Sequence, residues 1–300
     1  MIETKDLTKT FDNFTAVDSL NLKIENGEFF GLLGPNGAGK TTTISLLSTL
    51  LLPTKGEILI DGQQLTRQRP DLKRKISVIT QEYSMRQDMN MDEIMEYQGR
   101  LYFMPRKQIK ERTEELLEFC DLLKFRKRTV RKLSGGMKRK LMVCRALLTD
   151  PEILLLDEPT AGMDALSRRQ MWNLLRKLNE KNLTILLTTH YMEEAAEADQ
   201  VVIIDHGRQI ASGTPHELKQ KYAYDYLNIY RVKEEGIKSL GHPYTYNKDH
   251  YTIRVNHPGV VKEMILQKPE LFNDFELVKG RMDDVFLNVT GNKLPGGEQS

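Results

Sequence analysis

The sequence predicts an α/β protein with a mainly parallel sheet, an antiparallel β-subdomain near the N-terminus, a helical insertion and a small C-terminal α+β appendage. Short, largely apolar runs at residues 29–33, 153–157 and 183–189 are typical of strands that are buried on both faces of a parallel sheet. Segments with helical spacing alternate with these runs, as in right-handed βαβ units. A glycine-rich loop joins residues 29–33 to a helical pattern, which places a strand, a loop and a helix in succession.

Composition sets broad limits on the class of protein. The 300 residues suffice for one large domain and a smaller one. The formal net charge is +2, so no overall field favours nucleic acid, and we expect no nucleic-acid partner. No apolar run approaches the roughly eighteen residues of a membrane-spanning helix, and residues 1–5 show no signal-peptide core. The two cysteines, Cys120 and Cys144, predict reduced thiols in a cytosolic protein.

The first eighty residues favour strands. Alternating patterns and turns predict strands within residues 2–7, 14–24, 55–62 and 76–80. Between them, residues 41–52 are apolar at helical spacing and stop at Pro53, which predicts a helix.

The middle of the chain, residues 90–150, predicts a helical insertion. Asn90 and Glu93 have the spacing of a capping box that opens a helix to residue 102. Further helices are predicted at 107–123 and from Ser134 to residue 148. After the insertion, the predicted elements are strands and helices in alternation, over residues 153–157, 165–179, 183–189, 193–198 and 201–205.

A second domain is predicted from the change in composition after residue 220. We expect residues 1–220 to form the large domain and residues 221–292 a small α+β domain, with residues 293–300 as a disordered tail. In the small domain, the pattern predicts a hairpin around residues 247–249, a helix at 260–267 and a strand at 275–278.

Residues 34–41 fit the phosphate-loop pattern G-x-x-x-x-G-K-[ST], whereas an ordinary glycine turn is the alternative. Glycines let the backbone wrap around phosphate oxygens, and the helix N-terminus adds partial positive charge. We expect Lys40 to reach the β- and γ-phosphates, and the Thr41 hydroxyl to bind Mg²⁺. The sequence therefore predicts a P-loop NTPase site formed by Gly34, Pro35, Asn36, Gly37, Ala38, Gly39, Lys40, Thr41 and Thr42.

Polar residues also follow several predicted strands. Asp157 ends a strand where ligands of open α/β sheets bind, so its carboxylate can face Mg²⁺. Glu158 can orient and polarise an attacking water. Gln81 can contact Mg²⁺ or that water, and His190 can hydrogen-bond the γ-phosphate. Each of these residues taken alone also fits a loop, a cap or a structural role, so both interpretations stay open here.

A Ser-Gly-Gly sequence opens the helix that follows residue 133. Backbone N–H groups and the Ser134 hydroxyl can form a second anion site together with Gly135 and Gly136. The alternative is a simple turn before the helix.

Taken together and in this order, the motifs resemble those of the ATP-binding subunits of ABC transporters over residues 1–220. Residues 34–41 match the Walker A motif, residues 153–157 match Walker B, and Glu158 falls on the catalytic glutamate. Gln81 falls on the Q-loop, and residues 133–137 fall on the LSGGQ signature. Residues 161–164 match the D-loop, and His190 matches the switch histidine. Phe11 falls where the family has an aromatic residue that stacks on adenine, with core packing as the alternative.

The resemblance implies ATP as substrate and Mg²⁺ as cofactor, bound through Thr41, Gln81 and Asp157. It implies catalytic roles for Glu158, His190, Lys40 and Gln81, and nucleotide-binding roles for Ser134, Gly135, Gly136 and Asp164. It further implies a pair of such subunits, expected as a homodimer, in which each Walker A motif faces the partner's signature. A membrane permease is expected as a separate chain that grips the region of residues 81–102, which would place this protein at the cytoplasmic face of the membrane.

Two departures from the family pattern point to one branch. Met137 replaces the usual signature glutamine, and the D-loop is Ala-Gly-Met-Asp at residues 161–164. Both resemble the daunorubicin-resistance-type branch, as do residues 281–287 near the C-terminus, and this implies an exporter of drug, lipid, polysaccharide or ion. The other classes considered are a soluble ABC ATPase of translation, repair or cluster assembly, a GTPase, and a protein that binds ATP without hydrolysing it. A GTPase lacks support because no Asn-Lys-x-Asp motif occurs.

Overall fold

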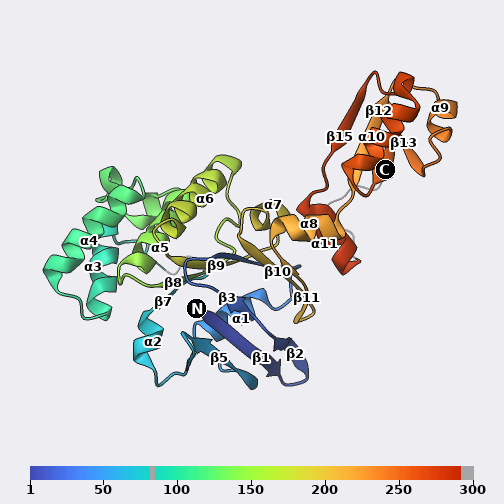
Figure 1. Cartoon of the computed structure of the whole chain (residues 1–300). Helices are drawn as coiled ribbons and strands as arrows, with labels where there is room; N and C mark the ends of the chain where they lie inside the picture. Colours follow the sequence, from blue (N-terminus) through green and yellow to red (C-terminus); the bar gives the residue numbers. More distant parts are fainter. Residues whose placement is uncertain (82–84, 292–300) are drawn as a thin grey trace. The chain divides into compact units, whose positions relative to one another are not determined.

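The computed structural model describes residues 1–81 and 85–291, and the chain divides into two compact units, Met1–Ser212 and Gly213–Ser300 (Figure 1). The tail predicted at 293–300 lies outside the described residues. The helices of the described part of the chain include none that is both long and apolar enough to cross a membrane.

The first unit opens with an antiparallel sheet built around β1 (Ile2–Phe11). Both β2 (Phe14–Leu20) and β5 (Lys55–Ile60) pair with β1 in antiparallel register. The short strand β3 (Lys23–Ile24) also pairs with β1, and β6 (Gln63–Gln64) pairs with β5. The predicted N-terminal antiparallel subdomain is therefore confirmed.

A second, six-stranded sheet carries the polar strand ends predicted above. Its order is β11-β10-β4-β9-β8-β7, and the neighbours from β10 to β7 are parallel. The central strands β4, β8 and β9 are buried along their whole length, which explains their largely apolar sequences. The strands are β4 (Phe29–Leu33), β7 (Ile76–Ile79), β8 (Ile153–Asp157), β9 (Thr184–Thr189), β10 (Gln200–Asp205) and β11 (Arg208–Gly213).

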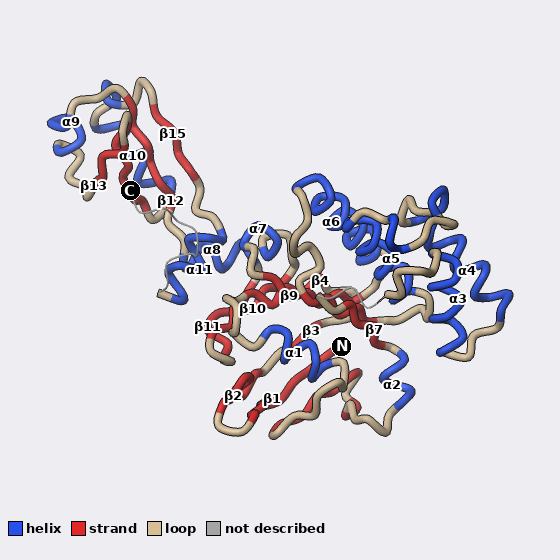
Figure 2. Tube along the Cα trace, turned by 180° about the vertical axis from the view of Figure 1, so that it is seen from behind, coloured by secondary structure: helices blue, strands red, loops and turns tan. Residues whose placement is uncertain are grey.

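Helices cover both faces of the parallel sheet (Figures 1 and 2). α1 (Lys40–Leu47) packs against β8 and β9 and also contacts β2, so it lies between the two sheets. On the opposite face, α5 (Gly135–Leu147) packs on β7 and α6 (Ala165–Asn179) packs on β9. A hydrophobic core between the two sheets, formed by residues such as Leu7, Leu32 and Leu46, holds α1 and the phosphate loop before it in place.

The helical insertion contains α3 (Met91–Leu101), α4 (Arg106–Phe119) and α5. The predicted capping box is confirmed, because Asn90 Oδ1 accepts from the backbone N–H of Glu93 and Glu93 Oε2 accepts from that of Asn90. Two short helices outside the insertion, α2 (Pro70–Arg74) and α7 (Met192–Ala195), complete the first unit.

Three predicted helices end earlier than expected, and one of them, predicted at 193–198, is α7, which stops at Ala195. α1 stops at Leu47 instead of residue 52, because Ser48 caps it and the backbone turns left-handed at Thr49, with φ of 61°. α4 likewise stops at Phe119 instead of residue 123, and Asp121 adopts φ of 59°. Apolar residues continue past the ends of α1 and α4 without being helical: after α4 Leu122 is buried, whereas after α1 Leu50 and Leu52 are exposed.

The second unit is a small α+β domain. Its elements follow a βαββαβ order, and its antiparallel sheet has the order β13-β14-β12-β15, the arrangement of ferredoxin-like units. The predicted hairpin and the strand at 275–278 are confirmed. The elements are α8 (Pro215–Tyr222), β12 (Asp225–Tyr230), α9 (Glu234–Lys238), β13 (Tyr244–Asn247), β14 (His250–Val255), α10 (Pro258–Gln267), β15 (Phe275–Val278) and α11 (Met282–Thr290).

Candidate nucleotide-binding site

The phosphate loop runs from β4 to α1 and is closely packed at two glycines. Gly39 precedes α1 with φ of 104°, and a Cβ there would lie 2.4 Å from the carbonyl oxygen of Ala16. A Cβ on Gly34 would lie 2.4 Å from the carbonyl oxygen of Ile204. Both positions therefore exclude a side chain, and the loop keeps its backbone N–H groups at the N-terminus of α1, as an anion site requires.

Lys40 is folded back against its own loop. Its side chain is buried, and Nζ donates to the carbonyl oxygens of Gly34 at 2.8 Å and Pro35 at 3.0 Å. Burial lowers the pKa of the Lys40 ammonium, and the nearby Glu158 carboxylate opposes this effect. The ammonium is thus held at the mouth of the loop by neutral acceptors that a phosphate can replace.

Three of the predicted residues meet at one carboxylate. Glu158 Oε1 lies 3.6 Å from Lys40 Nζ and 3.1 Å from His190 Nδ1. The Glu158 side chain is 13% exposed, whereas His190 is 33% exposed. A carboxylate that is mostly buried but keeps some exposed surface suits a group that orients and polarises water.

Thr188, which no sequence pattern predicted, hydrogen-bonds to both acidic residues at the end of β8. Its hydroxyl donates to Asp157 Oδ1 at 2.6 Å and accepts from the backbone N–H of Glu158 at 3.0 Å. β8 and β9 pair in parallel with Asp157 opposite Thr188, so this contact depends on strand register. No local sequence signal marks Thr188, because its partners lie about thirty residues away.

Oxygen donors suited to Mg²⁺ lie beside the loop. Asp157 is buried at the end of β8, against which α1 packs, and Thr41 is the second residue of α1. Gln81 follows β7, the neighbour of β8 in the sheet. Within the described ranges no cluster of three or more His, Cys, Asp or Glu side chains suits a metal ion. Mg²⁺ is usually bound by one or two protein oxygens, with phosphates and water as its other ligands, and a carboxylate and a hydroxyl fit this pattern.

The signature and the D-loop lie next to each other. Ser134 caps α5, accepting from the backbone N–H of Met137 at 3.3 Å, and Asp164 caps α6 by accepting from the backbone N–H and hydroxyl of Ser167. Those hydrogen bonds lower the pKa of the Asp164 carboxyl. A Cβ on Gly136 would lie 3.2 Å from Ser167 Oγ, so the two caps are neighbours. The signature and α6 border a hollow of about 450 Å³, whose lining includes Ser134, Gly136, Met137, Ser167, Gln170 and Lys177.

Glu194 is a second residue that no sequence pattern predicted. It is 2% exposed and accepts hydrogen bonds from the hydroxyls of Thr160 and Thr189. Thr160 precedes the D-loop and Thr189 precedes His190, so one buried carboxylate connects these two segments. In the sequence, Glu194 lies in a short acidic helix and cannot be distinguished from an exposed glutamate.

Phe11 lies on the surface at the end of the β1–β2 hairpin. Its side chain is 41% exposed, and Lys9 Nζ lies 4.9 Å from its ring centroid. Core packing, the alternative considered above, is therefore wrong for this ring. Stacking on adenine stays a prediction.

Comparison with known proteins identifies the family. A family model described as ABC transporter matches residues 17–161. The Nod factor export ATP-binding protein I of Cupriavidus metallidurans is 39% identical to this chain, and the alignment covers 98% of each protein. The chain belongs to the ABC transporter ATP-binding subunits. A GTPase is thereby excluded.

Other relatives and solved structures agree with this family. The daunorubicin/doxorubicin resistance ATP-binding protein DrrA of Streptomyces peucetius is 36% identical, over 97% of this subunit and 92% of the relative. A structure titled as an ATP-binding subunit of an ABC transporter is 27% identical, with a TM-score of 0.66 over 74% of this subunit and 93% of that chain. A dimeric ATP-binding cassette in a post-hydrolysis state, bound to ADP and Pi, is 28% identical, with a TM-score of 0.64 over 71% of this subunit and 98% of that chain. This ABC subunit is therefore an ATPase of the P-loop fold.

Proposed function

We propose that this ABC subunit hydrolyses ATP to drive an exporter, together with a separate membrane permease at the cytoplasmic face of the membrane. The observation that carries the proposal is near full-length similarity to subunits named for export or drug resistance. These include the two relatives above and the linearmycin resistance ATP-binding protein LnrL of Bacillus subtilis, which is 31% identical over 98% of this chain and 99% of the relative. The exported compound would then be a drug, lipid, polysaccharide or ion.

The phosphate loop would bind the nucleotide by exchanging partners at Lys40. Phosphate oxygens would replace the carbonyl oxygens of Gly34 and Pro35 and would draw the ammonium away from Glu158. Charge-assisted hydrogen bonds are stronger than those to neutral carbonyls, which favours the exchange. The exposed ring of Phe11 would stack on the adenine.

Mg²⁺ would be held by Asp157 and Thr41, with Gln81 beside it. Bound there, the ion would neutralise charge that develops on the phosphates. The buried Thr188 hydroxyl supports this role, because it binds one Asp157 oxygen and would leave the other for the ion.

Glu158 would act on the attacking water once Lys40 has turned to the phosphates. Its carboxylate would accept a hydrogen bond from the water and align it with the γ-phosphorus. His190 Nδ1, 3.1 Å from Glu158 Oε1, would hold the carboxylate in that direction.

Two copies of the chain would form the working unit. The signature residues Ser134, Gly136 and Met137 border a hollow together with residues of α6, and within the part of the chain that the structure describes its lining includes no residue of the phosphate loop. In a head-to-tail homodimer, the signature and Asp164 would complete the site of the partner.

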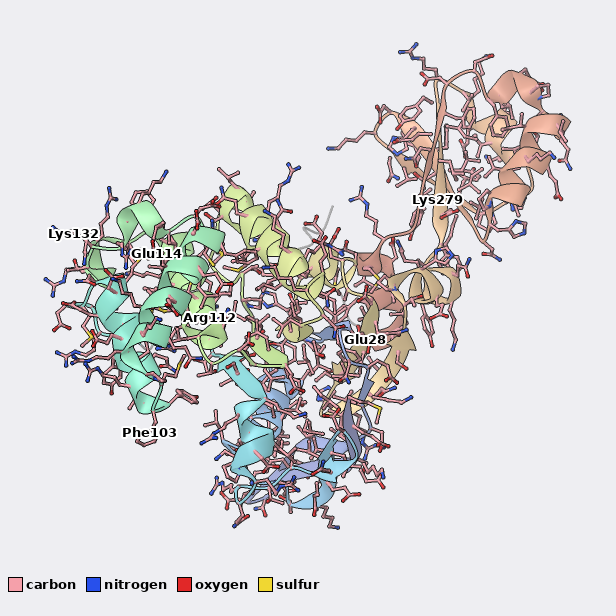
Figure 3. All side chains as sticks on the ribbon, turned by 60° about the vertical axis from the view of Figure 1, so that its left-hand side comes forward. Glu28, Phe103, Arg112, Glu114, Lys132 and Lys279 are labelled. Carbon is pink, nitrogen blue, oxygen red and sulfur yellow. The ribbon has the colours of Figure 1, made fainter. Side chains whose placement is uncertain are left out.

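An exposed apolar patch on the helical insertion would contact the permease. Tyr97, Leu101, Tyr102 and Phe103 cluster around the end of α3, and Phe103 is 92% exposed. Figure 3 shows Phe103 at the outer tip of this helical region. An exposed cluster of large apolar side chains is typical of a protein interface.

The test is to purify the tagged subunit from membranes, identify the co-purifying membrane protein, and measure ATPase activity with that protein in vesicles. We expect a multi-span permease that stimulates ATP hydrolysis. Phe103→Ser should weaken this complex while ATP binding persists, whereas Leu50→Ser, which changes an equally apolar exposed residue after α1, should not. Full activity in a soluble complex with translation, repair or cluster-assembly proteins, and no permease, would instead favour the soluble class.

A further inference from the structure

Arg139 is a fully buried arginine on α5, the helix that begins at the signature. Its side chain is 2% exposed and is among the largest fully buried side chains in the described residues. A buried guanidinium must be hydrogen-bonded to be tolerated. The proposed function so far assigns it no role.

The guanidinium of Arg139 joins the ends of two neighbouring strands. Nε donates to the carbonyl oxygen of Pro159 at 2.7 Å, and Nη2 donates to that of Glu158 at 2.8 Å. Nη1 donates to the carbonyl oxygens of Thr80 at 2.8 Å and Gln81 at 3.3 Å. One side chain thus contacts the segment after β8 and the segment after β7, and both segments carry predicted site residues. Arginine suits this position because its planar fork presents several donors in fixed directions.

The backbone of Glu158 needs such support. Its φ is 45°, in the left-handed region that costs energy for any residue with a side chain. Backbone of this kind persists only where the surroundings hold it. Thr188 accepts from the N–H of Glu158, and Arg139 donates to its carbonyl oxygen, so both ends of the residue are fixed.

We propose that Arg139 is a positioning residue for Glu158 and, through its bonds to Thr80 and Gln81, ties the signature helix to both strand ends. The proposal rests on the proposed catalytic role of Glu158. In this role Arg139 acts through the backbone carbonyl oxygen of Glu158 and not on the nucleotide. It sets the direction in which the Glu158 carboxylate leaves the end of β8, and a movement of α5 is thereby passed to that carboxylate.

The first test separates turnover from binding in Arg139→Gln and Arg139→Lys. We expect kcat to fall about 100-fold for the glutamine variant, since small displacements of reacting groups cost about this much. Lysine, which keeps the charge but lacks the fork, should rescue part of the loss, whereas KM for ATP should change less than about 3-fold in both variants. Arg145→Gln and Arg145→Lys, on the same helix, serve as matched controls and should keep near-normal kcat.

A double-mutant cycle then tests the route of the effect. If Arg139 acts through Glu158, Arg139→Lys should reduce kcat about 10-fold in the normal chain but less than about 3-fold when Glu158 is already glutamine. Melting temperature and ATP affinity are measured for each variant. If Arg139→Gln does not fold, the comparison is made with Arg139→Lys.

Three results would overturn the proposal: unchanged kcat in Arg139→Lys, loss of ATP binding in parallel with kcat, or the same fold-loss in both backgrounds. Failure of the underlying function is distinguishable, because Glu158→Gln alone would then leave turnover unchanged.

Discussion

The Nδ1 atom of His190 lies 3.1 Å from Oε1 of Glu158, although the two residues are separated by 32 positions in the chain. They meet because β8 and β9 are adjacent parallel strands that end at the same edge of the sheet. On the other side, the same Glu158 oxygen lies 3.6 Å from Lys40 Nζ. One carboxylate therefore stands between Lys40 of the phosphate loop and His190.

Replacing Glu158 by glutamine keeps the size of the side chain and removes its charge. We expect steady-state ATP turnover to fall roughly 10²- to 10⁴-fold, as for the loss of a general base, while ATP binding persists. An ATP-held dimer should accumulate, which size-exclusion chromatography with ATP can detect. Glu193→Gln, an exposed change in α7, is the matched control. Near-normal turnover in Glu158→Gln would remove this residue from its proposed role.

Thr188→Val removes the hydroxyl that links Asp157 to the backbone of Glu158 while keeping the shape of the side chain. We expect the free energy of unfolding to fall by about 1–3 kcal/mol, because a buried N–H loses its acceptor. Turnover should fall about 10-fold, which corresponds to a loss of about 1.4 kcal/mol at the transition state. More Mg²⁺ should be needed for half-maximal activity, because Asp157 loses the hydroxyl that holds it.

Thr184→Val is the control at the other end of β9, where the hydroxyl accepts from the backbone N–H of Gly27. It should lower stability in the same way but leave turnover and the Mg²⁺ requirement unchanged. Equal turnover in the two variants would show that the Thr188 hydroxyl does not position the acidic pair.

ATP affinity should depend on the protonation of Lys40. Burial lowers the pKa of this ammonium from its ordinary 10.5, so it loses its proton at a lower pH than an exposed lysine does. Because the phosphates need the cation, ATP affinity should decrease as pH rises through the lowered pKa, and bound ATP should raise that pKa again. Titrations with a fluorescent ATP analogue between about pH 7.5 and 10 measure the slope.

Lys40→Arg serves as the control for that slope, because a guanidinium stays charged over the whole range. Whatever its absolute affinity, its dissociation constant should vary less with pH than that of the normal chain. Parallel slopes in the two proteins would assign the pH dependence to another group.

A mixed dimer tests the head-to-tail arrangement. If Ser134 binds phosphate as proposed, Ser134→Ala would remove a hydrogen bond to a charged group, worth about 1.5–3 kcal/mol, or roughly 10- to 100-fold in rate. If Ser134 serves the partner's ATP, a dimer of Ser134→Ala and Glu158→Gln chains holds one doubly damaged site and one intact site. Mixing the two variants under conditions of chain exchange should then give more activity than their average.

Single-turnover measurement avoids the case in which the damaged site holds the mixed dimer closed. An absence of gain there, with mixed dimers shown to form, would contradict the model in which Ser134 acts across the interface.

The order of motifs along the chain could be predicted because their signals are local. Gly34, Lys40 and Thr41 are close in sequence, so neighbouring residues were enough to predict the phosphate loop. Asp157 directly ends an apolar run, which likewise predicted a buried parallel strand with an acidic end. The capping box at Asn90 is local in the same sense. Strand β11 and the early end of α1 were missed, because an edge strand with few buried residues carries a weak pattern and apolar spacing continues through a turn.

Only the tertiary structure decided how the site is held together. Thr188, Glu194 and Arg139 contact residues about 5 to 59 positions away in the chain, through hydrogen bonds whose geometry depends on strand register and helix packing. The same applies to Phe11, whose exposed ring a sequence pattern cannot separate from a buried one. Sequence alone thus determined which chemical groups the protein carries and in what order. Packing between distant segments determined which of these groups meet, because a hydrogen bond depends on distance and angle in space and not on separation along the chain.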